Sequence, residues 1–347
     1  MKHTKSRPSI LILYTGGTIG MVENPRTGAL ENFGLDRFME LFPELHRQPY
    51  NIDYVALEHP IDSSDMEPSG WVKIGQELVN RYDNYDGFVV LHGTDTMAYT
   101  ASALSFMFEN LGKPVILTGS QLPIGKLRTD GKENLLTSVE IAAARNEAGQ
   151  PMVPEVCIYF DSRLMRGNRT TKVNAEGFNA FRSFNYPPLA TAGISIRFEP
   201  RLIRYPDPAK PFRPHFRIDD HVMLLTLFPG IRREYVEAAL LQEGLKAVVI
   251  KTYGSGNAPQ KPWLAPLLTT LHQRGVVVVN NTQCSQGAVE MGRYETGLQL
   301  LQAGVINGYD STIESSLTKL MLLLGHERSQ EEVAEAMNRS LAGEITV

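Results

Sequence analysis

The sequence predicts an α/β protein, a three-layer sandwich divided into two α/β domains. Short apolar runs alternate along the chain with stretches of helical periodicity, which is typical of parallel βαβ units. Many of these runs end in a polar loop that contains Gly, Ser, Thr or Asp. The chain of 347 residues exceeds one typical domain, so two domains are expected. We therefore expect a larger N-terminal domain with a mostly parallel sheet and a smaller C-terminal domain with a parallel sheet.

The first predicted strand leads directly into a glycine-rich loop. Residues Ile10 to Leu13 are all apolar, as expected of a strand buried on both faces of a parallel sheet. The adjacent glycines Gly16 and Gly17 allow a sharp turn and a close approach to a ligand, and ligands bind beyond the carboxyl ends of such strands. The loop has no charge and matches no phosphate-binding glycine pattern. The alternative is a turn in which Thr18 only caps backbone amides.

The other elements follow from the same periodicities. In the first half we expect a polar flap at 21–33, strands at 52–57, 87–91, 114–118 and 155–160, and helices at 35–41, 71–82, 97–111 and 131–148. Seven prolines then lie between positions 187 and 214, and proline is excluded from central strands and helix interiors. We therefore expect a connector at 191–216 between domains at 1–190 and 217–347. In the second domain we expect strands at 222–227, 247–251 and 275–280 and helices at 312–324 and 331–341.

Composition excludes several classes of protein. Hydrophobic residues make up 42% and charged residues 21%, which is ordinary for a soluble globular protein. The formal net charge of −4 gives no bulk attraction to nucleic acid or to an anionic membrane, so neither partner is expected. The two cysteines, Cys157 and Cys284, form neither a disulfide framework nor a zinc spacing. The N-terminal apolar run is shorter than the roughly 7–15 residues of the apolar region of a signal peptide, so we expect a cytoplasmic protein.

Polar side chains follow each of the first three predicted strands. Parallel strands place their carboxyl ends at one edge of the sheet, so these groups should gather in one crevice. Together they could hold the ammonium and carboxylate groups of a small zwitterion. The alternative for the aspartate of the third loop is a helix N-cap. The residues are Thr15, Thr18, Asp62, Ser63, Ser64, Thr94 and Asp95.

A nucleophilic hydroxyl in this crevice needs a base, because a hydroxyl is a weak nucleophile at its own pKa. His92 precedes a glycine and could equally be a core residue. A lysine could serve if its pKa were lowered from about 10.4 towards neutrality, which costs roughly 4 kcal/mol and requires an enclosed position. The basic segment 161–173 could supply it. The alternatives are a solvated loop or a nucleic-acid patch formed by Arg163, Arg166 and Arg169.

Three segments resemble the signatures of the bacterial L-asparaginase/glutaminase family, most closely its type I, cytoplasmic branch. They are residues 14–20 (YTGGTIG), 91–97 (LHGTDTM) and 166–172 (RGNRTTK). The first two, in this order and at this spacing, are highly specific. Further resemblance extends across nearly the whole chain, at 62–66, 118–121, 253–260 and 281–284.

The resemblance implies an enzyme that hydrolyses L-asparagine to L-aspartate and ammonia without a metal or organic cofactor. It implies a flavodoxin-like N-terminal domain and subunits that pair as a homodimer or homotetramer, in which a C-terminal domain completes its neighbour's site. It also implies that Thr18 is the nucleophile and forms a covalent acyl-threonine intermediate. Thr94, Lys172 and Asp95 would form a second triad, with Lys172 lowering the proton affinity of Thr94.

The resemblance also implies how substrate is held. Asp62, Ser63 and Ser64 would bind the α-carboxylate side, Asp95 the ammonium group, and Ser120 the carboxamide through its carbonyl. Many relatives carry a tyrosine on the flap that bonds the nucleophile. This chain has no tyrosine in 21–33, so no flap tyrosine is assigned.

Several questions stay open at this point. Asparagine and glutamine differ by one methylene, which is worth only about 1–3 kcal/mol, so the sequence does not choose between them. The loops at 252–259 and 281–287 could line a second pocket, with Lys251 and Cys284 as effector contacts, or could pack an interface. Two other functions compete: the asparaginase-like subunit of a tRNA-dependent amidotransferase and a non-catalytic amino-acid-binding module.

Overall fold

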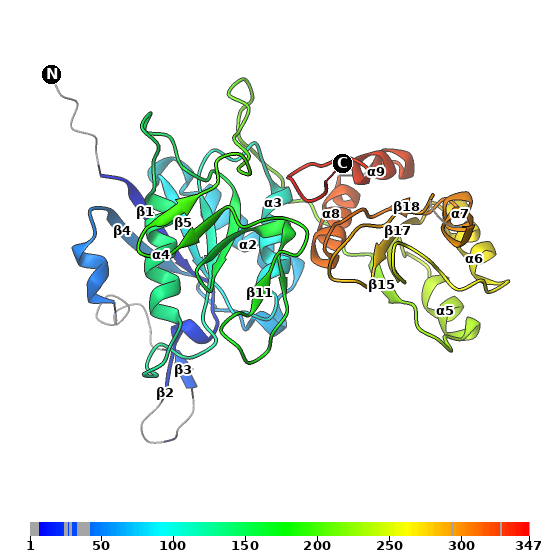
Figure 1. The fold of residues 1–347 in the computed structure, drawn as a ribbon, viewed down its shortest axis with the longest axis horizontal. Helices are drawn as coiled ribbons and strands as arrows, with labels where there is room; N and C mark the ends of the chain where they lie inside the picture. Colours follow the sequence, from blue (N-terminus) through cyan, green and yellow to red (C-terminus); the bar gives the residue numbers. More distant parts are fainter. Residues whose placement is uncertain are drawn as a thin grey trace. The chain divides into compact units, whose positions relative to one another are not determined.

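The structure is a computed structural model that describes residues 7–23, 27, 30–32, 42–292, 295–326 and 328–346. The chain divides into two compact units, Met1–Pro214 and His215–Val347, here called the N-terminal and C-terminal units (Figure 1). The helix expected at 35–41 lies outside the described residues. Within the described ranges, no helix is long and apolar enough to cross a bilayer.

The N-terminal unit is built on an eight-stranded, mostly parallel sheet, as predicted. Its spatial order is β13-β12-β9-β8-β7-β5-β1-β4, of which β8 to β4 are parallel and β9, β12 and β13 antiparallel. The strands are β1 (Ser9–Tyr14), β4 (Asn51–Ala56), β5 (Gly87–Leu91), β7 (Val115–Thr118), β8 (Val156–Phe160), β9 (Arg163–Arg166), β12 (Ala190–Ala192) and β13 (Ile196–Phe198). The parallel part has the flavodoxin-like order 2-1-3-4-5 when its five strands are numbered along the chain.

In the described part of the chain, three helices cover this sheet: α2 (Pro68–Val79), α3 (Met97–Met107) and α4 (Gly131–Ala143). The predicted apolar stripe of α2 is buried at Trp71, Ile74 and Leu78. Helix α3 has nine of its eleven residues buried, which agrees with its small, apolar composition. Helix α4 ends earlier than predicted because Ala144 adopts an extended backbone, with φ −62° and ψ 134°.

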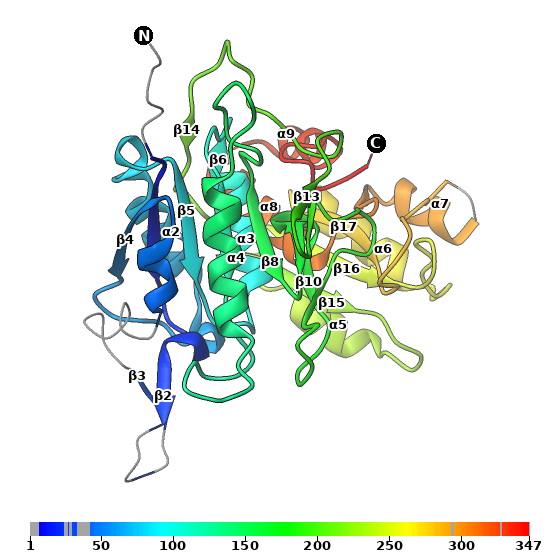
Figure 2. The ribbon, with the colours of Figure 1, turned by 60° about the vertical axis from the view of Figure 1, so that its left-hand side comes forward.

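The crossovers through α3 and α4 differ in hand. Both connections step in the same direction across the sheet, from β5 to β7 and from β7 to β8. Helix α4 packs Leu135 and Val139 against Ile12, Val89 and other residues of one face of the sheet. Helix α3 lies on the opposite face (Figures 1 and 2). Since parallel crossovers are right-handed in about 98% of cases, one of these two is the rare left-handed form. No local pattern in the sequence predicts this.

Short elements complete the N-terminal unit. They are β2 (Met21–Glu23) paired with β3 (Leu30–Asn32), β6 (Phe108–Glu109) paired with β14 (Arg213–Pro214), β10 (Thr171–Lys172) paired with β11 (Phe181–Arg182), and the 3-10 turns η1 (Thr18–Gly20), η3 (Pro43–Arg47), η4 (Ser63–Asp65), η5 (Tyr82–Asn84) and η6 (Gly167–Arg169). The stretch 191–216, expected as a connector, carries β13 and β14, and the boundary between the compact units falls within it, after Pro214.

The C-terminal unit contains a four-stranded sheet in the order β15-β16-β17-β18, with every pair parallel. The predicted elements are β15 (Val222–Thr226), β16 (Ala247–Thr252), β17 (Val277–Thr282), α8 (Ile313–Gly325) and α9 (Gln330–Met337). The elements that were not predicted are α5 (Arg233–Leu240), α6 (Leu264–Gln273), α7 (Glu295–Gln302) and β18 (Ile306–Asn307). Two of these helices span only two turns, which is too short for a clear period in the sequence.

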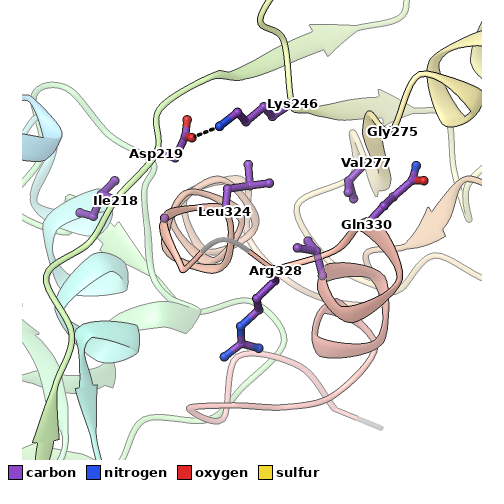
Figure 3. A pocket seen from close by; sticks show the side chains of 10 residues that line it. Ile218, Asp219, Lys246, Gly275, Val277, Leu324, Arg328 and Gln330 are labelled. Carbon is purple, nitrogen blue, oxygen red and sulfur yellow. Dashed lines mark hydrogen bonds and ion pairs between the residues drawn. The ribbon is translucent and has the colours of Figure 1, made fainter.

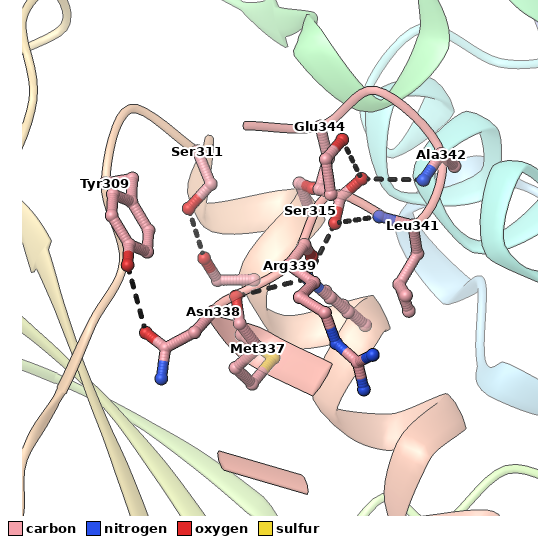
Figure 4. Close-up of polar contacts among 12 residues, drawn as sticks. Tyr309, Ser311, Ser315, Met337, Asn338, Arg339, Leu341, Ala342 and Glu344 are labelled. Atoms are coloured by element: carbon pink, nitrogen blue, oxygen red, sulfur yellow. Dashed lines mark hydrogen bonds and ion pairs between the residues drawn. The ribbon is translucent and has the colours of Figure 1, made fainter. Parts of the chain in front are cut away.

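A buried ion pair ties the last residues of the chain to α8. Lys319 Nζ lies 2.6 Å from Glu344 Oε1, and the two side chains are 2% and 1% exposed. Lys319 also donates to the carbonyls of Met337 and Arg339. Glu344 accepts the backbone N–H groups of Leu341 and Ala342 (Figure 4). Both charges therefore have several partners, which buried charges require.

We predict that Glu344→Gln lowers the free energy of unfolding of the C-terminal unit by about 3–5 kcal/mol, because it leaves the buried Lys319 charge uncompensated. Urea unfolding measures this. The matched control is Glu335→Gln, which breaks the exposed pair with Arg339 and should cost no more than about 1 kcal/mol. Equal losses in the two variants would contradict the assignment.

Candidate active site

The candidate site lies where the parallel sheet of the N-terminal unit changes direction. From β1 the chain continues towards β4, and from β5 it continues towards β7, in the opposite direction along the sheet. The loops after β1 and β5 therefore border a crevice at the carboxyl ends of these strands. The loop after β1 carries Thr18, and the loop after β5 carries Thr94 and Asp95. The topology thus places both predicted threonine loops at one switch point.

The two loops touch through their glycines. A Cβ atom built on Gly17 would lie 2.4 Å from the backbone nitrogen of Gly93, so only glycine fits. Gly17 also has φ 91°, a left-handed conformation that favours glycine. Thr18 and Thr94 each follow one of these glycines directly. The contact therefore brings the two threonine backbones together, as the sequence predicted, although their separation along the chain is large.

The second loop, at residues 61–65, packs against the first. A Cβ atom on Gly16 would lie 2.0 Å from the carbonyl oxygen of Ile61. Ser63 is buried, and its Oγ atom would meet a Cβ atom on Gly93 at 2.4 Å. Asp62 Oδ1 accepts hydrogen bonds of 3.0 Å from both the backbone N–H and the hydroxyl of Ser64. The structure thus places the expected carboxylate and serines beside the threonine loops.

Lys172 reaches the site from a distant segment, on β10. Its Nζ atom lies 2.9 Å from Thr94 Oγ1 and 2.6 Å from Asp95 Oδ1. The lysine side chain is 19% exposed and that of Asp95 is 61% exposed, so the amine is enclosed while the carboxylate faces solvent. Thr96, not Asp95, occupies the position before α3, so the N-cap alternative for Asp95 is wrong.

A buried cation supports the segment that carries Lys172. Arg166 Nε donates to Glu155 Oε2 at 2.6 Å, and the side chains are 3% and 8% exposed. Arg166 and Arg169 both lie over the ring of Tyr186, at 4.4 and 5.2 Å. The alternative of a nucleic-acid patch is therefore wrong for these two arginines; only Arg163 of the three is exposed.

Two other predicted candidates are structural. Thr15 is buried and its hydroxyl donates to the carbonyl of Leu91 at 2.9 Å, so it joins β1 to β5. His92 is buried, with Nε2 2.9 Å from the hydroxyl of Thr100 and Nδ1 2.7 Å from the carbonyl oxygen of Gly93. Burial lowers the pKa of His92 from 6.5 to about 4, so the ring is neutral at pH 7 and is committed to the core.

The fourth loop adds Ser120 and a residue that the sequence analysis did not select. Ser120 is 2% exposed and lies near Ile19, since a Cβ atom on Gly131 would contact both side chains. Gln121 Oε1 accepts the Thr94 hydroxyl at 3.1 Å, and Gln121 Nε2 donates to the carbonyl of Gly177. The available signal was that Gln121 lies in the polar loop that follows β7 (Val115–Thr118).

The arrangement supports hydroxyl-based acyl transfer. Thr94 is held between an ammonium donor and an amide acceptor, which fixes the direction of its hydroxyl. A second hydroxyl, Thr18, follows on the adjoining loop. Such a pairing of hydroxyl and lysine is one of the known ways to activate a weak nucleophile.

The C-terminal unit holds a separate polar region. A cavity of about 430 Å³ is lined by Asp219, Lys246 and Arg328 among other residues (Figure 3). In the described part of the chain, one cluster offers three possible metal ligands: Asp219, Asp220 and His221. Asp219 already accepts Lys246 at 2.5 Å and the His221 ring at 2.7 Å, so its oxygens are engaged. Lys251 is half-buried on β16 and Cys284 is exposed; their effector role stays a prediction.

Comparisons with known proteins agree with this geometry. Residues 9–204 match the family model Asparaginase, N-terminal, and residues 221–337 match the Glutaminase/Asparaginase C-terminal domain. The chain is 46% identical to L-asparaginase 1 of Escherichia coli (strain K12), covering 98% of each chain. It is 43% identical to the 60 kDa lysophospholipase of Homo sapiens, covering 97% of this chain and 61% of that protein. The crystal structure of L-asparaginase I from Vibrio cholerae O1 biovar eltor str. N16961 matches with a TM-score of 0.89 and 44% identity, over 99% of this chain and 100% of that chain.

Fold and site together define a two-unit α/β protein with a threonine–lysine centre at the switch point of its larger sheet. The family matches span both units at high coverage. The chain belongs to the asparaginase family.

We predict that the neutral state of His92 makes the fold sensitive to acid. Below pH 6.5 His92 is protonated in the unfolded chain, but in the folded chain it stays neutral down to about pH 4. The free energy of unfolding therefore falls by up to about 3 kcal/mol as the pH is lowered through this window. Urea unfolding at pH 7 and pH 5 should therefore show a smaller acid loss for His92→Gln than for the wild type. The exposed His59→Gln serves as control; identical pH profiles for all three proteins would refute the prediction.

Proposed function

We propose that this protein is an L-asparagine amidohydrolase that produces L-aspartate and ammonia. The observation that carries the proposal is the 2.9 Å contact between Lys172 Nζ and Thr94 Oγ1, on a loop that adjoins the loop of Thr18. A binding module has no need of an enclosed amine on a hydroxyl at this position. Similarity to a protein named L-asparaginase 1 over 98% of the chain supports the same reaction.

The proposed reaction has two steps. The Thr18 oxygen bonds to the side-chain carbonyl carbon of asparagine, the C–N bond breaks, and the nitrogen leaves as ammonia with the hydroxyl proton. Water then attacks the acyl-threonine ester, L-aspartate is released, and one proton returns to the Thr18 oxygen. Thr94 and Lys172 relay protons during these steps, and Asp95 holds the lysine in place.

The proposed substrate contacts follow from the loops that surround the two threonines. Asp62, Ser63 and Ser64 bind the α-carboxylate side through hydroxyl and backbone donors, which the 3.0 Å bonds within this loop orient. Asp95, whose carboxylate is largely exposed, also receives the substrate ammonium group. Ser120 lies against the carboxamide. The reaction uses no metal and no organic cofactor.

The test is ammonia release from L-asparagine, L-glutamine and D-asparagine by purified protein with no RNA present. We expect Thr18→Ala to abolish turnover, because it removes the nucleophile, and Lys172→Met to lower kcat by about 10²- to 10⁴-fold, because it removes a group from the proton path. The matched controls are Thr191→Ala and Lys73→Met, which change exposed residues and should retain wild-type rates.

Undiminished turnover by Thr18→Ala would remove this residue from its role. A wild type that binds asparagine and releases no ammonia would instead favour the binding-module alternative. Activity that appears only with a charged tRNA would favour the amidotransferase subunit. The last two results each separate one competing function from the proposal.

We also propose that the enzyme is cytoplasmic and assembles as a homodimer or homotetramer. The resemblance to type I asparaginases supports both statements. Sedimentation velocity should give a mass of two or four chains of 38.6 kDa at micromolar concentration. A single species at the mass of one chain, with full activity, would contradict the assembly.

A further inference from the structure

The carboxylate of Asp130, at the start of helix α4, binds a neighbouring loop instead of its own helix. Asp130 occupies the N-cap position of α4, yet its side chain makes no capping bond to that helix. Instead, its oxygens accept the backbone N–H of Gln121 at 3.0 Å each and that of Leu122 at 3.2 Å. An aspartate at this position usually caps its own helix. Asp130 therefore holds the loop of Ser120 rather than the helix that follows it.

The same helical turn fixes both peptide groups that flank Ser120. The side chain of Asn134, 2% exposed, donates to the carbonyl oxygen of Gly119 at 3.0 Å, and it also contacts Asp130 Oδ2 at 3.3 Å. Asp130 fixes the next peptide through the N–H of Gln121. In a trans peptide the carbonyl points opposite to the N–H, so the Ser120 carbonyl must point away from Asp130. The described residues contain no cis peptide bond.

The Ser120 carbonyl is left without a donor by this arrangement. Ser120 is buried, and among the described residues no N–H or O–H group donates to its carbonyl oxygen. Its hydroxyl is engaged elsewhere, because it donates to the carbonyl of Leu122 at 2.7 Å. Buried backbone carbonyls are almost always paired, so the missing donor points to a ligand.

We propose that Asp130 is a positioning residue for the reaction, which acts by aiming the Ser120 carbonyl at the carboxamide N–H of the substrate. The inference rests on the proposed function. Asp130 does not touch the substrate; it sets the plane of the Ser120–Gln121 peptide. Its effect therefore depends on a substrate N–H donor, and a side-chain ester of aspartate has none.

The experiment compares L-asparagine with L-aspartic acid β-methyl ester as substrates for the wild type, Asp130→Ala and Asp130→Asn. We expect Asp130→Ala to raise KM for asparagine about tenfold, the value of one hydrogen bond, and to change KM for the ester less than about twofold. Asp130→Asn keeps one acceptor oxygen for Gln121 and Leu122, so its effect should lie between the two. Circular dichroism checks the fold of each variant.

The matched control is Asp219→Asn, which alters a carboxylate that accepts the backbone N–H of His221 in the C-terminal unit. It should leave KM for both substrates unchanged. Equal losses for amide and ester in the Asp130 variants would show a merely structural role and overturn the inference, as would wild-type kinetics. A wild type that releases neither ammonia nor methanol would overturn the proposed function itself and this inference with it.

Discussion

The candidate site depends on one close approach between two loop backbones, at Gly17 and Gly93. A Cβ atom on Gly17 would stand 2.4 Å from the nitrogen of Gly93, a distance that no side chain tolerates. Because the contact lies one residue before each of Thr18 and Thr94, it brings the backbones of these two threonines close together. The parallel pairing of β1 with β5, in which Tyr14 lies opposite Leu91, places both loops at the same edge of the sheet.

A second constraint brings the amine to these hydroxyls. Lys172 lies 78 positions beyond Thr94, and the chain between them contributes β7, β8 and β9 to the sheet. The buried pair of Arg166 with Glu155 anchors the segment before the lysine, and the pairing of β10 with β11 directs its side chain. A buried ion pair contributes little net stability, so its role here is to specify position. Lys172 forms an ion pair with Asp95, whose side chain is exposed to solvent.

The fourth loop shows how one helix start can serve a site without contacting its ligand. Asp130 and Asn134 engage three backbone groups of the loop that carries Ser120 and Gln121. Gln121 in turn accepts the hydroxyl of Thr94. The fourth loop is therefore coupled to the threonine–lysine pair, and the Thr94 hydroxyl is oriented by two residues from distant segments, Gln121 and Lys172.

The sequence by itself determined the parallel strands, because short apolar runs such as Ile10 to Leu13, bounded by turn residues, are typical of strands buried on both faces of a sheet. It also determined that hydroxyls and carboxylates gather at one edge, since strand ends and turn glycines are local signals. Only the tertiary structure decided that Lys172 points into the site while Arg166 forms a buried ion pair. It also decided that one crossover is left-handed and that Asp130 accepts hydrogen bonds from a loop instead of capping its helix. These outcomes depend on which distant segments meet in the packed core, and no local period or propensity encodes such a meeting.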